Sequence, residues 1–184
     1  MQKIKHDADD SNACVSFSAV STEMRSIIGQ VTKDFSSVLS SMLDIDTPIM
    51  ETRDGYPFKE FKDVVENGEH LEHFHSYQNY GSNYDGDINT IETHTDQGVF
   101  IVFTPGKVVN KNDSSSKISD GFYIQMQDGS NSMVDFNEKD LVFMLGDGIQ
   151  QYINPKISSE GRKLRATPHF LCAPSHGENE ARVW

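Results

Sequence analysis

Residues 93–103 read THTDQGVFIVF and place two polar side chains directly before a run of apolar residues. The run from Val99 to Phe103 is rich in β-branched and aromatic residues, which is typical of a buried β-strand. His94 and Asp96 lie two positions apart, so on an extended chain an imidazole and a carboxylate point to the same side and can reach one metal ion. An H-x-D tripeptide also arises by chance, and a surface histidine beside an aspartate is the alternative interpretation.

On both sides of this stretch, short apolar runs alternate with turn-forming residues, which predicts many short strands. Turn sequences such as Asp128-Gly129-Ser130 and Gly146-Asp147-Gly148 separate these runs. We expect residues 107–120, with their Asn-Asp-Ser-Ser-Ser run, to form a long mobile loop that could cover a site. The pattern favours an α+β domain built on antiparallel sheets. The expected strands are residues 70–77, 89–93, 98–103, 122–127, 132–136, 141–145, 149–153 and 164–171.

The sequence before residue 69 has helical patterns. Residues 1–19 are polar and mixed, and we expect an N-terminal arm there, followed by one domain over residues 20–184 whose metal-site region is 70–184. A helix of about six turns is predicted from Ser21, with Ser21 or Thr22 as its N-cap. A shorter helix is predicted within residues 57–67. The apolar stripe of the first helix consists of Ile27, Ile28, Val31, Phe35, Val38, Leu39, Met42 and Leu43.

Composition narrows the classes of protein to consider. The chain has 184 residues, of which 16 are Lys or Arg and 28 are Asp or Glu, so the formal net charge is -12. This charge repels phosphate backbones, and we expect no nucleic-acid partner. The chain offers neither a signal peptide nor a membrane span, and its two cysteines favour a reducing compartment. We therefore expect a cytoplasmic protein with no membrane partner, while its oligomeric state stays open.

Two later segments of the sequence contain further motifs that go with His94 and Asp96. Gly146-Asp147-Gly148-Ile149 is followed by Asn154, and a strand-like run further on carries His169. With H-x-D-x-G before them, these segments resemble the iron(II)- and 2-oxoglutarate-dependent dioxygenases, in the branch similar to isopenicillin N synthase. The resemblance covers roughly residues 70–184. It implies a double-stranded β-helix, or jelly-roll, core with one or two N-terminal supporting helices.

The resemblance also implies that Fe(II) is held by His94, Asp96 and His169. Two imidazoles and one carboxylate on one face of an iron ion leave three positions open, as needed to bind a chelating cosubstrate and dioxygen together. A closed structural metal site would leave no coordination position open. Zinc accepts the same ligands, so the residues alone do not distinguish the two metals.

By the same resemblance, 2-oxoglutarate is the expected cosubstrate. Its far carboxylate would meet Arg182, whose fork of donors suits a carboxylate. The family has a serine two residues after this arginine, where the present chain has Trp184. An Asn-x-Tyr pair of the family matches His75 and Tyr77, so Tyr77 could donate a hydrogen bond to the carboxylate while His75 replaces the asparagine.

The expected activity is oxidation of a small organic substrate, by hydroxylation or otherwise, with release of succinate and CO2. The alternative is a noncatalytic double-stranded β-helix module for binding or assembly that keeps a relic metal site. Two local clusters have open interpretations. The basic residues of 162–165 could receive an acidic group or form a solvated face, and His70, His73 and His75 could bind a separate metal or be ordinary solvated histidines.

Overall fold

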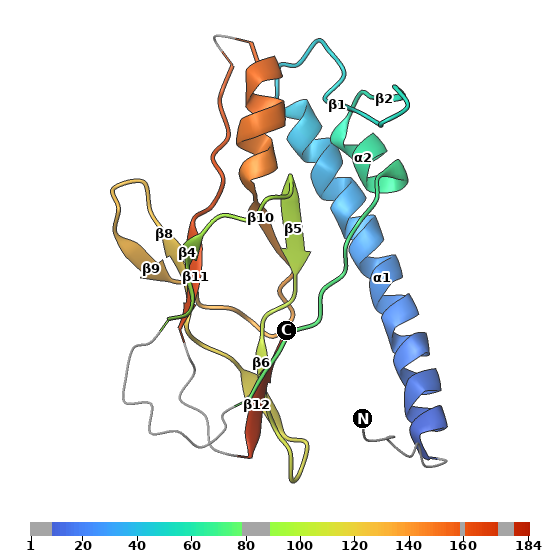
Figure 1. Ribbon diagram of the computed structural model, residues 1–184, viewed down its shortest axis with the longest axis vertical. Coiled ribbons are helices and arrows are strands. Elements are labelled where there is room, and N and C mark those ends of the chain that lie inside the picture. The colour runs from blue at the N-terminus through green and yellow to red at the C-terminus, as the bar shows by residue number, and fades with distance from the viewer. Residues whose placement is uncertain (1–8, 79–88, 159–160, 173–178) are drawn as a thin grey trace, which may run out of the picture. The chain divides into compact units, whose positions relative to one another are not determined.

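The computed structural model describes residues 9–78, 89–158, 161–172 and 179–184 (Figure 1). These residues form two compact units. The helical unit comprises the described residues up to 43 together with Pro48–Gly68, and the β unit comprises Asp44–Thr47 and the described residues from Glu69 to Trp184. No helix in the described part of the chain is long and apolar enough to cross a membrane.

The helical unit consists of two helices and a small hairpin. Helix α1 spans Asp9–Ser41 and α2 spans Phe61–Asn67, while β1 (Met50–Glu51) pairs antiparallel with β2 (Pro57–Phe58). An ion pair of 3.2 Å between Lys33 and Glu66 joins the helices. The amide of Phe61 also donates to the hydroxyl of Ser40 at 3.2 Å. The shorter helix predicted within residues 57–67 is thus confirmed over its second half.

The predicted start of the first helix is wrong. The helix already begins at Asp9, and the hydroxyls of Ser21 and Thr22 donate to the carbonyl of Ser18 inside it. Hydroxyls that bond back to the preceding turn are compatible with a helix interior. Ser21 and Thr22 therefore did not mark the N-terminus of the helix. The predicted apolar stripe is also divided, because Leu39 is buried while Ile27 and Val38 are each 58% exposed.

The β unit is built from antiparallel strands in three sheets (Figure 1). The first has the order β4-β11-β8-β9, the second β3-β12-β6-β7, and the third is the pair β10-β5. Strands from the two ends of the unit pair with each other in a nested fashion: β3 with β12, β4 with β11, β5 with β10, and β8 with β9. The bounds are β3 Ser76–Gln78, β4 Asn89–His94, β5 Phe100–Phe103, β6 Lys107–Asn110, β7 Ser116–Ile118, β8 Phe122–Gln125, β9 Asn131–Met133, β10 Val142–Leu145, β11 His169–Cys172 and β12 Glu180–Val183.

An aromatic and aliphatic core fills the β unit. Its buried members are Phe122, Phe136, Met144 and Leu171. Phe122 and Leu171 are register partners on neighbouring strands, and they share one face of their sheet. His169 lies two residues before Leu171 and therefore points to the same face. The core thus extends to His169, one of the candidate ligands, and the packing of the sheet fixes the direction of its imidazole.

Other expectations about elements are wrong, among them the strand over residues 164–171, since β11 begins only at His169. Residues 107–120 are not a long loop, because they contain the paired strands β6 and β7. Residues 149–153 are not a strand, because they form the π-helical segment η1 (Ile149–Ile153), which continues into the 3-10 segment η2 (Asn154–Lys156). Of residues 70–77, only the last two are in a strand.

Candidate metal centre

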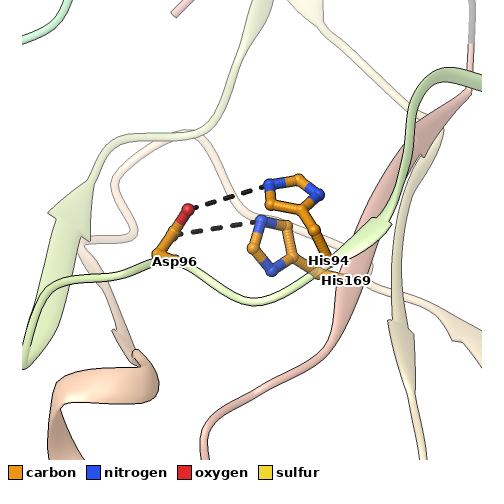
Figure 2. A group of neighbouring side chains, drawn as sticks. All are labelled: His94, Asp96 and His169. Atoms are coloured by element: carbon orange, nitrogen blue, oxygen red, sulfur yellow. Dashed lines mark ion pairs between the residues drawn. The ribbon is translucent and has the colours of Figure 1, made fainter.

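Three side chains from separate parts of the sequence meet at one end of the sheet that contains β4 and β11. His94 is the last residue of β4, His169 is the first of β11, and the two are register partners across the ladder. Asp96 lies in the loop that follows β4 and faces both imidazoles (Figure 2). The structure thus brings together the three residues that the sequence predicts as ligands.

The ligand atoms lie close enough to share one ion. Nε2 of His94 is 3.8 Å from Oδ1 of Asp96, and Nε2 of His169 is 4.0 Å from Oδ2 (Figure 2). Two atoms that each lie about 2.1 Å from a metal can be at most about 4.2 Å apart. Both separations fall within that bound, so one ion can bridge each pair with small side-chain adjustments.

Hydrogen bonds fix which nitrogen of each imidazole is available. Nδ1 of His94 lies 2.7 Å from the carbonyl of Glu92, and Nδ1 of His169 lies 3.0 Å from the carbonyl of Thr167. A carbonyl only accepts, so each Nδ1 must carry the proton. In the neutral ring, Nε2 then keeps its lone pair and faces Asp96, which is the arrangement of metal-ligating histidines.

The centre is open on one side and packed on the other. The side chains of His94 and Asp96 are 39% and 30% exposed, whereas that of His169 is 9% exposed. The ring of Phe122 stacks on the His169 imidazole with a centroid distance of 5.5 Å and an interplanar angle of 22°. A ligand in solution can therefore approach past His94 and Asp96, while Phe122 shields the opposite side.

Arg182 lies elsewhere in the β unit and is fully buried. Each of its nitrogens donates one hydrogen bond: Nε to the hydroxyl of Ser119, Nη1 to the carbonyl of Cys172, and Nη2 to the carbonyl of Asp120. In the described part of the chain, no ion pair joins a carboxylate to this guanidinium. Burial lowers the pKa of Arg182, and the nearby Asp120 opposes this effect.

Tyr77 and His75 lie beside Arg182 on the edge strand. Tyr77 is the register partner of Arg182 across β3 and β12, and directly opposed residues share one face of a sheet. His75 exchanges two backbone hydrogen bonds with Trp184, of 3.1 and 3.0 Å, and its ring stacks on Tyr77. The structure therefore places the three residues predicted to contact a cosubstrate on one face, apart from the three predicted ligands.

Trp184 connects the two groups through the core. Its indole ring lies 5.7 Å from the ring of Phe122, which in turn stacks on His169. The indole Nε1 is buried and has no hydrogen-bond partner in the part of the chain that the structure describes. A buried donor without an acceptor is rare in folded proteins and indicates either an absent ligand or a local cost in stability.

The remaining clusters have simpler contacts. The ammonium of Lys163 donates to the carbonyls of Asn154 and Ile157, at 2.9 and 2.8 Å, and so neutralises a helix end. It is not placed to receive an acidic substrate. His73 and His75 are exposed and their rings stack 5.8 Å apart. Among the described residues, the group of three that could hold a metal ion is His94, Asp96 and His169.

Sequence reasoning missed Phe122 and Ser119 as neighbours of the candidate site residues. Both come from segments far along the chain from their partners; Ser119 is 63 positions from Arg182. The apolar run 122–127 identified Phe122 only as a core residue. No signal in the sequence indicated that its ring would stack on a candidate ligand.

No protein-family model matches the chain, and no curated protein matches it.

Proposed function

We propose that the protein is an Fe(II)- and 2-oxoglutarate-dependent oxygenase that acts on a small organic substrate. The observation that carries the proposal is that His94, Asp96 and His169 each offer a ligand atom within 4.8 Å of the others, with Nε2 of both histidines facing the carboxylate. Two histidines and one carboxylate with open positions are typical of non-haem iron oxygenases. Zinc accepts the same ligands, so the metal is part of the proposal.

The donor set fits an iron ion in its protonation as well as its position. Each imidazole is held by a backbone carbonyl at Nδ1, which leaves Nε2 free to bind. When bound with 2-oxoglutarate and O2, Fe(II) would supply the redox chemistry that converts R–H to R–OH and 2-oxoglutarate to succinate and CO2. The chain itself orients the two rings and shields the Phe122 side from water.

Arg182 supports 2-oxoglutarate as the cosubstrate. A buried guanidinium with no carboxylate paired to it among the described residues favours an anionic ligand, since burying a charge is costly and the nearby Asp120 offsets this cost only in part. The Cys172 carbonyl that Arg182 contacts is three residues along β11 from His169, roughly 10 Å at about 3.3 Å per residue. A five-carbon diacid could link a metal to this arginine, with Trp184 Nε1 as a further donor.

The nested strand pairing supports a jelly roll for the β unit. In such a fold a long antiparallel hairpin is wrapped into two sheets, so that the first strand pairs with the last and the second with the last but one. The pairs β3 with β12, β4 with β11 and β5 with β10 follow this rule, and the strands inside them form the hairpins β6–β7 and β8–β9. The two larger sheets have four strands each.

A noncatalytic binding or assembly module with a relic metal site is the second candidate. One observation favours it: Phe122 and Trp184 pack into the region between His169 and Arg182, where a cosubstrate would have to lie. The two candidates differ in whether 2-oxoglutarate is consumed.

Succinate release separates them. The purified protein is incubated with Fe(II), 2-oxoglutarate and O2, with and without a panel of small organic substrates, and compared with Asp96→Ala. The proposal predicts metal-dependent succinate release that a substrate stimulates and that Asp96→Ala abolishes. Turnover that survives in Asp96→Ala, or metal binding with no succinate under any condition, would contradict it.

A further inference from the structure

The chain between β10 and η2 touches both of the segments that carry candidate ligands. We name residues 146–154, from the Gly-Asp-Gly turn to Asn154, the bracing segment. We propose that the bracing segment sets the position of Asp96 relative to His169, and that Asn154 is the positioning residue for the His169 side. This inference rests on the metal site proposed above, but it concerns residues that are not ligands themselves.

One end of the bracing segment holds the loop of Asp96 through backbone alone. The amide of Asp147 donates to the carbonyl of Asp96 at 2.6 Å, and the amide of Gly148 donates to the carbonyl of Gly98 at 3.0 Å. A third bond of 3.0 Å runs from the amide of Gly146 to the carbonyl of Val99. Three consecutive amides therefore fix the loop in which Asp96 lies.

The other end holds the chain that leads into His169. The side-chain amide of Asn154 makes two hydrogen bonds to Leu164: Nδ2 donates to its carbonyl at 2.7 Å, and Oδ1 accepts from its amide at 2.9 Å. Oε1 of Gln150 accepts from the amide of Ala166 at 2.8 Å. Residues 164–167 precede β11 and belong to no strand, so these side chains take the place of a sheet neighbour.

The piece between the two ends is anchored in the core. Ile149 and Ile153 are both fully buried. Beyond Asn154, the ammonium of Lys163 bonds the carbonyls at the end of the helical segment, including that of Asn154 itself at 2.9 Å. The bracing segment is therefore held along its length.

Its consequence is a fixed span between two ligands. Asp96 and His169 are 73 positions apart in the sequence, and their carboxylate and imidazole are 4.0 Å apart. The amide of Thr167 also donates to the carbonyl of Leu145, just before the bracing segment. Loss of the Asn154 contacts would release residues 164 and 165 and leave the chain into His169 held, among the described residues, only at residues 166–168, by Gln150, Leu145 and Gln125. We expect the His169 ring to lose its fixed position as a result, while His94 and Asp96 stay in place.

The experiment measures metal affinity in variants that keep all three ligands. Mn²⁺ and Co²⁺ are titrated into the wild type and Asn154→Ala, with Asn112→Ala, in the exposed turn between β6 and β7, as the matched control outside the bracing segment. Loss of a residue that orients a ligand typically weakens metal binding by about 10–100-fold. We expect that loss in Asn154→Ala and wild-type affinity in Asn112→Ala. Equal affinity of Asn154→Ala and the wild type would overturn the inference.

A second variant and a spectroscopic measurement test the inference further, including the case in which Asn154→Ala does not fold. Asn154→Asp keeps the acceptor for the Leu164 amide and loses the donor to the Leu164 carbonyl. We expect it to bind metal with an affinity between those of the wild type and Asn154→Ala, and it replaces Asn154→Ala if that variant does not fold. In the metal-free proteins, ¹H–¹⁵N spectra of the histidine rings report whether His169 keeps its proton on Nδ1. The inference predicts that Asn154→Ala loses this preference while His94 keeps it, and unchanged His169 signals would overturn it. A wild type that binds no metal would instead refute the proposed function and leave the ring spectra to judge the inference.

Discussion

At the scale of single residues, the tightest packing beside the site is between two stretches of backbone. Gly146 lies so close to the loop of Asp96 that a Cβ there would contact the carbonyl oxygen of Gly98 and lie 2.7 Å from that of Asp96. Gly98 itself has room, because its Cβ would meet only the Phe100 carbonyl at 3.8 Å. Of the two glycines, Gly146 therefore has a steric need to be glycine and Gly98 shows none, although both stand in the motifs of the resemblance.

Gly146→Ala should therefore destabilise the protein by about 1–3 kcal/mol, since the new methyl group forces backbone apart. It should also weaken metal binding, because the backbone that must move is that of Asp96. Urea unfolding and a Co²⁺ titration measure the two effects. Gly98→Ala is the control and should stay within about 0.5 kcal/mol of the wild type. A tolerated Gly146→Ala would show that the close approach is not maintained in solution.

The ligands were predictable from the sequence, whereas their supports were not. His94 and Asp96 stand two apart at a strand end, and that spacing alone indicates a shared direction. The double hydrogen bond of Asn154 to Leu164 joins residues ten positions apart, and Asn154 directly follows a π-helical segment that no periodicity indicates. The partners of Arg182 come from still further away, so only the folded chain brings them together.

At the scale of elements, the errors have a common cause. Short runs such as Ile149–Ile153 contain β-branched and aromatic residues in a number that suits a strand or a buried helical turn equally well. The Gly146–Gly148 turn and the Asn154 contacts decide for the helix. In residues 107–120, only Val108 and Val109 carry a strand signal, and the register with β12 and β7 makes them a strand.

The end of the helical segment is the element where one cation matters. Lys163 bonds three carbonyls, those of Asn154, Ile157 and Ser158. Lys163→Met keeps most of the apolar stem but removes the ammonium donor from these carbonyls, and we expect a loss of about 1–2 kcal/mol. The neighbouring exposed Arg162→Met is the control and should change stability little. Chemical denaturation of both variants checks the prediction, which equal stabilities would refute.

The hairpin between β8 and β9 gives a prediction about pH. The hydroxyl of Ser130 donates to the carboxylate of Asp128, and this bond, with one from the Ser130 amide, lowers the pKa of Asp128. A lowered folded pKa means that the turn gains stability above the ordinary value of 3.8 and loses it as the pH falls through the folded pKa.

Ser130→Ala removes the larger of the two bonds, so the pKa of Asp128 should rise towards 3.8. Carboxyl-carbon NMR across the acid range measures this. Asp113, held by Ser115 in the same way, is the internal control and should titrate as in the wild type. An unchanged Asp128 would mean that the hydroxyl contact does not form in solution.

At the scale of the whole molecule, the distribution of charge is more informative than the net charge. The chain carries a net charge of -12, yet Arg182 is buried in the β unit without a carboxylate paired to it among the described residues. The negative net charge of the protein attracts cations, whereas the buried guanidinium of Arg182 attracts an anion into the β unit. That residues 20–184 form one domain, and that the protein is cytoplasmic, stay predictions.

The central claim is that His94, Asp96 and His169 form one iron centre that also takes 2-oxoglutarate. The most direct measurement is an anaerobic titration of the purified protein with Fe(II) and then 2-oxoglutarate, followed by visible absorbance. The account predicts a weak charge-transfer band that needs both components, disappears in Asp96→Ala, and requires more 2-oxoglutarate in Arg182→Met. Iron binding without any band on addition of 2-oxoglutarate would contradict the account and favour the noncatalytic module.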